Sequence, residues 1–205
     1  MPKRNPASII LASASPRRRQ LMSDAGYEFT IVLPEVDESA FKTNDADPVE
    51  YAKRLALAKA KSVARKYPDS FVIGADTIVD FQGRIIGKAA DAEEAEQITR
   101  KLFSEPHKVI TGVAIVRLSD GTELVQSDST TVYPRKMTPE QIADHIKSGS
   151  WRDKAGAYAI QETGDEFVEK IEGSLTNVMG LPVELLESLL ADPKICVGRK
   201  QKKQP

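Results

Sequence analysis

The chain has 205 residues, of which 40% are hydrophobic and 29% charged, enough to form a substantial core in one elaborated domain. This composition excludes an intrinsically disordered chain and a collagen-like repeat. Lysine and arginine together number 29 against 30 acidic residues, so the formal net charge of -1 provides no overall field for binding nucleic acid.

The single cysteine, Cys196, excludes an internal disulfide and a cysteine-based zinc cluster, and it favours a reducing compartment. The apolar run at residues 9–12 is too short for the hydrophobic region of a signal peptide. No run approaches the roughly 18 apolar residues of a membrane span. We therefore expect a cytoplasmic protein that does not associate with a membrane.

Hydrophobic periodicity and turn residues predict strands and helices that alternate along the chain. Apolar runs predict strands at 8–12, 29–33, 71–75, 107–118, 123–133 and 167–171. Amphipathic spacing predicts helices at 16–25, 48–67, 91–102, 139–148 and 182–190. Hairpin turns are indicated at 80–83 and 120–121. This mixture predicts an α/β or α+β sheet flanked by helices.

A first polar cluster, residues 13–19, follows the first predicted strand and opens a helix. Its serines and three arginines could converge on an anion, because a helix N-terminus offers N–H groups and arginine binds phosphate through two hydrogen bonds. A cap by Ser15 with solvated arginines explains the pattern equally well. At most two of three successive arginines can face the same ligand.

Acidic residues form two further groups. Asp76 follows the predicted strand 71–75, and an acid at a buried strand end must cap a turn, form an ion pair, or hold a metal or water. Glu35, Asp37 and Glu38 would add the oxygen ligands that Mg²⁺ and Mn²⁺ prefer. Three acids in a loop are more often simply solvated.

Lysines and small residues extend the candidate site. Lys59 lies on the apolar stripe of the helix at 48–67, where a lysine can also run along the surface to reach solvent. Lys88 follows the first hairpin. The stretch 154–161 joins lysine, tyrosine and glutamine to small residues that let a ligand approach the backbone.

The histidines indicate no catalytic triad. His107 lies on a predicted strand and His145 on a predicted helix, and neither has a serine or cysteine nucleophile motif nearby. The chain also has no phosphate-binding loop ending in Gly-Lys-Ser/Thr and no convincing Gly-x-Gly-x-x-Gly motif, so kinase-like and dinucleotide-binding readings are weak.

Seven short motifs, taken together and in order, resemble the Maf family of nucleoside triphosphate pyrophosphatases. They are ILASASPRR at 10–18, VDE at 36–38, IGADTIV at 73–79, GK at 87–88, KAGAY at 154–158, IQ at 160–161 and VMGLP at 178–182. Each motif alone is weak, but the ordered set is highly specific and spans about residues 9–190.

The resemblance implies a mixed α/β fold, with a twisted mixed sheet flanked by helices and split into two lobes around a central cleft, as in inosine triphosphate pyrophosphatases. It also implies hydrolysis of a nucleoside triphosphate between its α and β phosphates with a divalent cation (Mg²⁺, Mn²⁺ or Co²⁺), and a homodimer. We divide the chain into an N-terminal extension at 1–8, the family domain at 9–191 and a basic, disordered tail at 192–205.

The resemblance also assigns roles to individual residues. Asp76 would act as general base on the attacking water, or share with Glu38 the metal that activates it. The residues expected to bind the substrate are Ser13, Arg17, Arg18, Lys59, Thr77, Lys88, Lys154 and Gln161. Of these, Arg17, Thr77 and Gln161 match the branch that acts on dTTP and UTP, and the amide of Gln161 suits the O4/N3 edge of a pyrimidine.

Two other functions compete with a dTTP/UTP pyrophosphatase that also acts on modified pyrimidine nucleotides. One is a 7-methyl-GTP pyrophosphatase, and the other is a nucleotide-binding regulator of septum formation and cell division that needs no catalysis. The presence of Asp76, Glu38 and the lysines favours an enzyme. Ala159 stands where the family has glycine, which leaves the nucleotide preference open. Direct nucleic-acid binding is disfavoured by the near-zero net charge.

Overall fold

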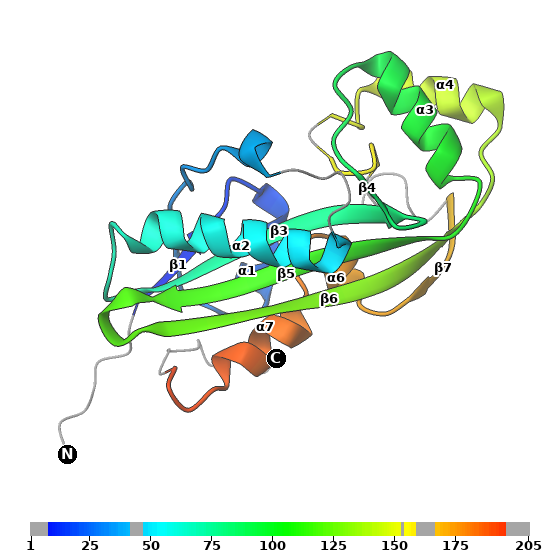
Figure 1. Cartoon of the computed structure of the whole chain (residues 1–205). Helices are drawn as coiled ribbons and strands as arrows, with labels where there is room; N and C mark the ends of the chain where they lie inside the picture. Colours follow the sequence, from blue (N-terminus) through cyan, green and yellow to red (C-terminus); the bar gives the residue numbers. More distant parts are fainter. Residues whose placement is uncertain (1–7, 42–46, 153, 159–166, 196–205) are drawn as a thin grey trace.

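The computed structural model describes residues 8–41, 47–152, 154–158 and 167–195, which form one mixed sheet with helices on both faces (Figure 1). The elements are, in order, β1 (Ile9–Ala12), α1 (Pro16–Asp24), β2 (Thr30–Ile31), η1 (Glu38–Ala40), α2 (Pro48–Ala64), β3 (Phe71–Phe81), β4 (Arg84–Ile86), α3 (Ala92–Leu102), β5 (His107–Arg117), η2 (Leu118–Asp120), β6 (Thr122–Pro134), α4 (Pro139–Ser148), β7 (Val168–Glu172), α6 (Leu175–Val178) and α7 (Val183–Leu190). The mixed α/β class is confirmed. None of the described helices is long and apolar enough to cross a membrane.

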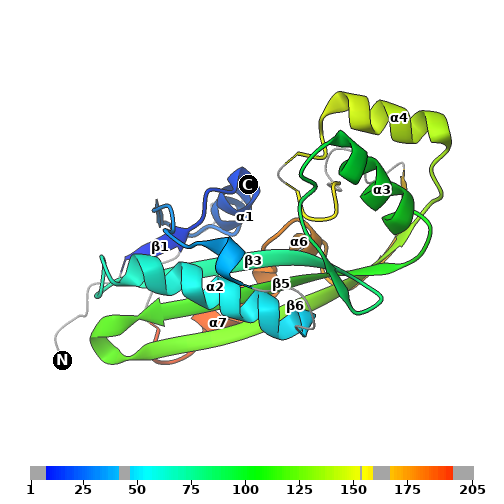
Figure 2. The ribbon, with the colours of Figure 1, turned by 45° about the horizontal axis from the view of Figure 1, so that its top comes forward.

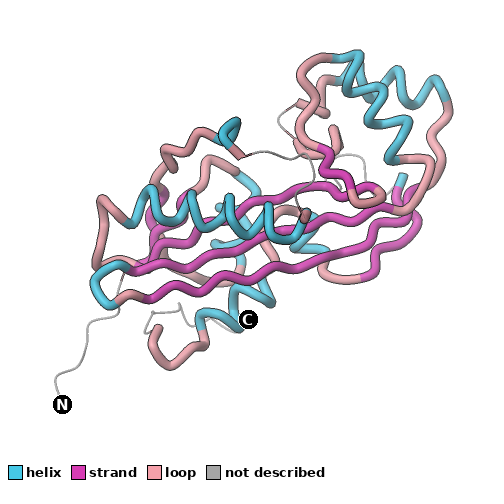
Figure 3. Tube along the Cα trace, in the orientation of Figure 1, coloured by secondary structure: helices cyan, strands magenta, loops and turns pink. Residues whose placement is uncertain are grey.

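The described sheet has seven strands, with the path β2-β1-β3-β5-β6-β7 and with β4 paired to β3. β1 runs parallel to both β2 and β3, whereas all the other pairs are antiparallel. The long strands β3, β5 and β6 lie side by side through the centre of the molecule (Figure 3). Because β3 pairs first with β1 and later with β4, it connects the two ends of the fold.

Two glycines let α2 lie close against the sheet. A Cβ at Gly74 of β3 would fall 2.3 Å from the carbonyl oxygen of Ala56, and one at Gly112 of β5 would fall 2.4 Å from that of Ala52. These distances are shorter than any real contact, so only glycine permits this approach. Alanines of α2 then pack on β1, β3 and β5 in a buried cluster. The close approach places the buried side of α2 directly over the middle of β3.

The opposite face of the sheet is covered by α1 and α7, whose Leu21, Met22, Leu186 and Leu190 pack against β1, β3 and β5. At the far end, α3 and α4 form a separate layer beside β4 (Figure 2). A distinct aromatic cluster fills this end, with Phe103 in edge-to-face contact with Tyr158 and Phe167. The elements thus form two lobes that share the long strands.

The structure corrects three expected boundaries. The strand expected at 29–33 is only Thr30–Ile31, because it pairs with β1 alone at the edge of the sheet. The helix expected to reach residue 67 ends at Ala64. The strand expected to end at residue 75 continues to Phe81, since β5 pairs with it along its whole length. Asp76 therefore lies in the middle of a strand and not at its end.

We predict that Gly74→Ala destabilises the fold, because the new methyl group overlaps the backbone of α2 and must push the helix away. Overpacking of this kind costs about 1–3 kcal/mol, so the free energy of unfolding in urea should fall by that amount. Gly87→Ala is the control, since nothing lies within 4 Å of a Cβ at Gly87. Equal stability of the two variants would contradict this account of how α2 is placed.

Candidate active site

The candidate site forms where the edge of β3 is left open between two short strands. β1 pairs with β3 only as far as Gly74, and β4 begins to pair only at Val79. The four residues between them, 75–78, pair on one side with β5, and on the other side no described strand covers them. An interrupted edge of this kind gives side chains and ligands access to the backbone of a central strand.

A cleft of about 1170 Å³ lies along this open edge and is lined by both lobes. This volume is somewhat larger than that of ordinary ligand pockets, which is about 300–1,000 Å³. The described residues to which the resemblance assigns a role all line it: Ser13, Arg17, Arg18, Glu38, Lys59, Asp76, Thr77, Lys88 and Lys154. Gln161 lies outside the described residues. The expectation of two lobes around a cleft is therefore confirmed.

An ion triad with two buried members and one exposed member lies on the α2 side of the cleft. Nζ of Lys59 is 2.7 Å from Oδ1 of Asp76 and 2.8 Å from Oε1 of Glu38. The side chains of Lys59 and Asp76 are only 10% and 9% exposed, whereas that of Glu38 is 50% exposed. Lys59 thus points inward from the apolar stripe of α2 and joins a strand carboxylate to a carboxylate of the 3-10 helix η1.

The two carboxylates of this triad differ in their electrostatics. Burial raises the pKa of Asp76 above its ordinary value of 3.8, and this effect outweighs the nearby positive charges of Lys59 and Arg18. Burial acts the same way on Glu38, but its hydrogen bond to Lys59 and the charges of Lys59, Lys88 and Arg18 lower its pKa overall. Asp76 is therefore the better proton acceptor of the two near neutral pH.

The acidic loop before η1 does not act as one cluster. Glu35 forms an ion pair with Lys66 at 2.6 Å, and Asp37 caps η1 by accepting hydrogen bonds from Ser39. Only Glu38 reaches the ion triad. The alternative in which all three acids converge with Asp76 is therefore wrong, because Glu35 pairs with Lys66 and Asp37 is used as the cap of η1.

Asp76 and Thr77 lie on opposite faces of β3, as successive strand residues must. The hydroxyl of Thr77 accepts a hydrogen bond from Arg18 at 3.0 Å and shares another with Thr111 at 2.9 Å. Arg18 also donates to the carbonyl oxygen of Ala75 at 2.9 Å and to that of Gly180 at 2.7 Å. The guanidinium group thereby covers the open edge of β3 and ties it to the loop after α6.

The loop between β1 and α1 is shaped by its own serines. Ser15 caps α1 by accepting from the backbone N–H of Arg18 at 3.4 Å, and Ser13 accepts from the N–H of Ser15 at 3.1 Å. Ser13 is buried, and both Arg17 and Arg18 reach the cleft while Arg19 does not line it. The helix cap expected of Ser15 is therefore present, and in the same loop two of the three arginines reach the cleft.

The second lobe contributes two lysines to the opposite wall of the cleft. Lys88 forms an isolated antiparallel bridge with Ala155, and the N–H of Gly156 donates to the carbonyl oxygen of Gly87 at 3.0 Å. Nζ of Lys154 donates to the carbonyl oxygen of Ser150. This pairing brings Lys88 and Lys154, which are far apart in sequence, to one wall.

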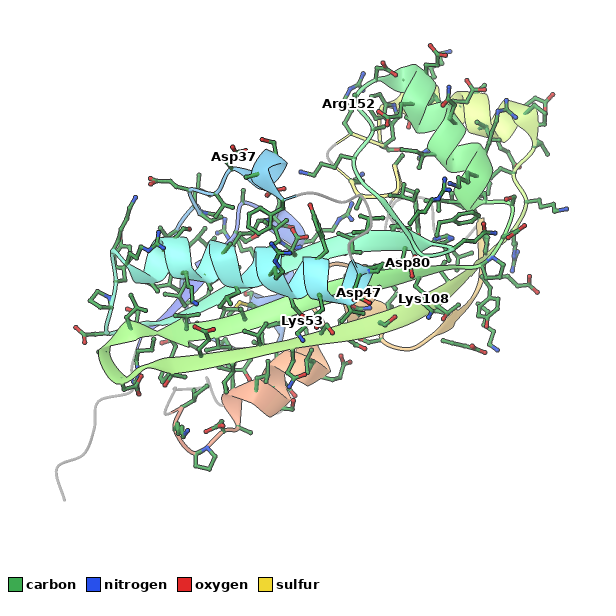
Figure 4. The ribbon with its side chains drawn as sticks, in the orientation of Figure 1. Asp37, Asp47, Lys53, Asp80, Lys108 and Arg152 are labelled. Carbon is green, nitrogen blue, oxygen red and sulfur yellow. The ribbon has the colours of Figure 1, made fainter. Side chains whose placement is uncertain are left out.

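Sequence reasoning missed two polar residues of the cleft, Tyr51 and Arg152. Figure 4 shows Arg152 on the α3–α4 lobe and Asp37 across from it on the other lobe. The guanidinium group of Arg152 packs over the ring of Trp151, 4.7 Å from its centroid. The only available signal was its position two residues before Lys154.

Comparison with known proteins shows strong similarity along most of the chain. Residues 8–192 match the family described as Maf-like protein. A dTTP/UTP pyrophosphatase of Citrifermentans bemidjiense is 44% identical over 184 residues, which cover 89% of this chain and 94% of the relative. One of Geotalea uraniireducens is 45% identical over the same shares of both chains. Among solved structures, the Staphylococcus aureus Ham1 protein matches 89% of this chain and 97% of its own with a TM-score of 0.48 and 13% identity.

We predict that Lys59→Met destabilises the protein more at pH 8 than at pH 5. Without the ammonium group the pKa of Asp76 rises further. At high pH the buried, unpaired carboxylate then lowers the free energy of unfolding. At low pH the carboxyl group is protonated and this loss of stability disappears. Removing one partner of a buried pair costs about 3–5 kcal/mol. At pH 8 the melting temperature should then fall by about 6–20 °C.

Lys53→Met is the control for this prediction, because Lys53 lies on the same helix and pairs with Glu50 at the surface. Loss of an exposed pair should change stability by less than about 1 kcal/mol at either pH. A pH-independent loss of stability in Lys59→Met would contradict the assignment of the buried charge to Asp76.

Proposed function

Since the chain belongs to the Maf-like protein family, we propose that it hydrolyses dTTP and UTP, including modified pyrimidine nucleotides, to the monophosphate and pyrophosphate. The family resemblance expected from the ordered motifs is confirmed. Relatives named dTTP/UTP pyrophosphatase, at 42–45% identity over nearly the whole domain, support nucleoside triphosphate pyrophosphatase activity. The choice of pyrimidine is supported further by Arg17 and Thr77, which both line the cleft.

The charge of the cleft suits a polyphosphate. Six cationic side chains line it, namely Arg17, Arg18, Lys59, Lys88, Arg152 and Lys154, against the two carboxylates of Glu38 and Asp76. A net positive cleft attracts a triphosphate and stabilises the charge that develops on pyrophosphate as it leaves. The cations come from both lobes, so a substrate lying in the cleft contacts the two walls at once.

Asp76 is the residue that we assign to proton transfer. Its carboxylate is buried beside the cleft, and burial gives it a raised pKa that favours acceptance of a proton from an attacking water. Lys59 fixes the carboxylate through the 2.7 Å contact and keeps it ionised enough to act as a base. The oxygen of the water adds to the α phosphorus while Asp76 takes its proton. The anhydride bond between the α and β phosphates breaks, and its electron pair leaves with pyrophosphate.

The carboxylates also suit a divalent cation. Glu38 and Asp76 both direct a carboxylate oxygen at the ammonium group of Lys59, so the two oxygens lie close together. Mg²⁺ and Mn²⁺ prefer oxygen ligands of this kind. No three acidic, histidine or cysteine side chains gather as a metal site in the described parts of the chain. Glu38 and Asp76 would therefore hold an ion together with water and phosphate oxygens. When bound, the ion would neutralise phosphate charge and acidify a water molecule.

The observation that carries the proposal is the buried carboxylate of Asp76 at the open edge of β3, facing a cationic cleft. The test is release of pyrophosphate from dTTP, UTP, CTP and 7-methyl-GTP with Mg²⁺, Mn²⁺ or Co²⁺. We expect dTTP and UTP to be turned over fastest. A preference for 7-methyl-GTP would overturn the choice of base, and no turnover with any metal would favour the nucleotide-binding regulator.

Asp76→Asn should lower kcat by about 10²–10⁴-fold, because the amide cannot accept the proton, while circular dichroism shows a folded chain. Asp80→Asn is the matched control: it lies on the same strand but its carboxylate accepts from the N–H of Gly83 in the hairpin turn. Its activity should stay within about twofold of the unmodified protein. Full activity of Asp76→Asn would remove the general base from the proposal.

We also propose a homodimer and a family domain at residues 9–191, as the resemblance implies, and a cytoplasmic location, as the single cysteine favours. Light scattering after size-exclusion chromatography tests the dimer. We expect a mass of twice the 22.5 kDa chain, and a mass of one chain at micromolar concentration would contradict it.

A further inference from the structure

The segment 154–158 has a backbone conformation that needs support from its surroundings. Gly156 and Ala157 adopt φ values of 72° and 57°, so two successive residues are left-handed. An L-residue such as alanine rarely adopts this conformation and keeps it only where neighbouring groups hold it. Ala157 is completely buried, whereas Lys154, Ala155 and Tyr158 of the same segment line the cleft.

His145 of α4 contacts this segment at Ala157. Its Nε2 lies 2.8 Å from the carbonyl oxygen of Ala157, and its Nδ1 faces the hydroxyl of Ser150 at 3.3 Å. A carbonyl oxygen only accepts, so Nε2 must carry the proton and Nδ1 is left to accept from Ser150. The ring is buried and donates directly to the strained residue.

His107 of β5 contacts the segment at Tyr158. Its Nδ1 lies 3.2 Å from the carbonyl oxygen of Leu102, which places the proton on Nδ1. Its Nε2 lies 2.6 Å from the hydroxyl of Tyr158 and therefore accepts from it. Burial lowers the pKa of His107 and keeps the ring neutral, as this hydrogen-bond pattern requires. The two histidines use opposite tautomers to hold adjacent residues.

We propose that His107 and His145 are positioning residues for the reaction: from two different elements they hold residues 154–158 in the left-handed turn that presents Lys154 to the substrate. The inference rests on the proposed function. The same turn carries the Gly156–Gly87 hydrogen bond that places Lys88 on this wall, so the histidines act on two substrate-facing lysines. Neither histidine lines the cleft, and each acts through the segment.

The first test compares His145→Leu with His145→Gln in pyrophosphate release from dTTP. Leucine removes the donor to Ala157, whereas the amide nitrogen of glutamine reproduces a donor in the place of Nε2. We expect His145→Leu to raise KM about tenfold, with kcat changed less than threefold, and His145→Gln to stay within about twofold of the unmodified enzyme. An unchanged KM in His145→Leu, or no recovery with glutamine, would overturn the proposal.

The second test is a double-mutant cycle with Lys154→Gln. If His145 acts mainly by placing Lys154, most of its effect disappears once Lys154 is replaced, and only the part that acts through Lys88 remains. His145→Leu should therefore raise KM clearly less in the Lys154→Gln background than the roughly tenfold expected in the unmodified enzyme. A general loss of structure would instead multiply the two single effects. Multiplicative effects on KM would overturn the proposal.

Thr99→Val is the matched control, because Thr99 is buried in the same lobe and its hydroxyl donates to the carbonyl oxygen of Ala95 within its own helix. Its KM should stay within about twofold of the unmodified enzyme.

If His145→Leu does not fold, Tyr158→Phe tests the other histidine by removing only the hydroxyl that donates to His107, and it too should raise KM severalfold. An unchanged KM in Tyr158→Phe would then overturn the proposal. An unmodified enzyme with no turnover would overturn the proposed function instead, so the two failures are distinguishable.

Discussion

The ion triad of Lys59, Asp76 and Glu38 is the interaction on which the rest of the site depends. A carboxylate buried in the middle of a strand is costly unless a cation reaches it. Lys59 does so only because Gly74 and Gly112 bring α2 against the sheet, and Glu38 reaches the same ammonium group from the facing loop. The packing of the helix therefore determines the charge at the centre of the cleft.

The interrupted edge of β3 provides the second constraint. A continuous neighbouring strand would close the space that the substrate needs, whereas β1 and β4 leave four residues uncovered between them. Arg18 covers part of that edge and binds Ala75, Thr77 and Gly180, so it links three separate parts of the chain. The site is thus a gap in a sheet, held in shape by side chains from both lobes.

The ordered motifs allowed the family, the mixed sheet and most of the cleft to be predicted from sequence. The position of Asp76 within β3 could not be, because an apolar run does not show how far a strand is continued by pairing with β5. Nor could spacing separate Glu38 from Glu35 and Asp37, because the difference lies in their partners: Glu35 pairs with Lys66, and Asp37 caps η1. Arg152 belongs to no motif, so its place in the cleft, where it packs on Trp151, is known only from the structure.

The most direct test of this account is a titration of the Asp76 carboxyl by ¹³C NMR, with the resonance assigned through the Asp76→Asn variant. Burial against α2 should outweigh the attraction of Lys59 and Arg18, so we predict a pKa above the ordinary 3.8. Such a value would show a buried carboxylate suited to accept a proton. A pKa at or below 3.8 would mean that the cations dominate and that Asp76 is a tightly paired structural anion, which would contradict its role as the general base.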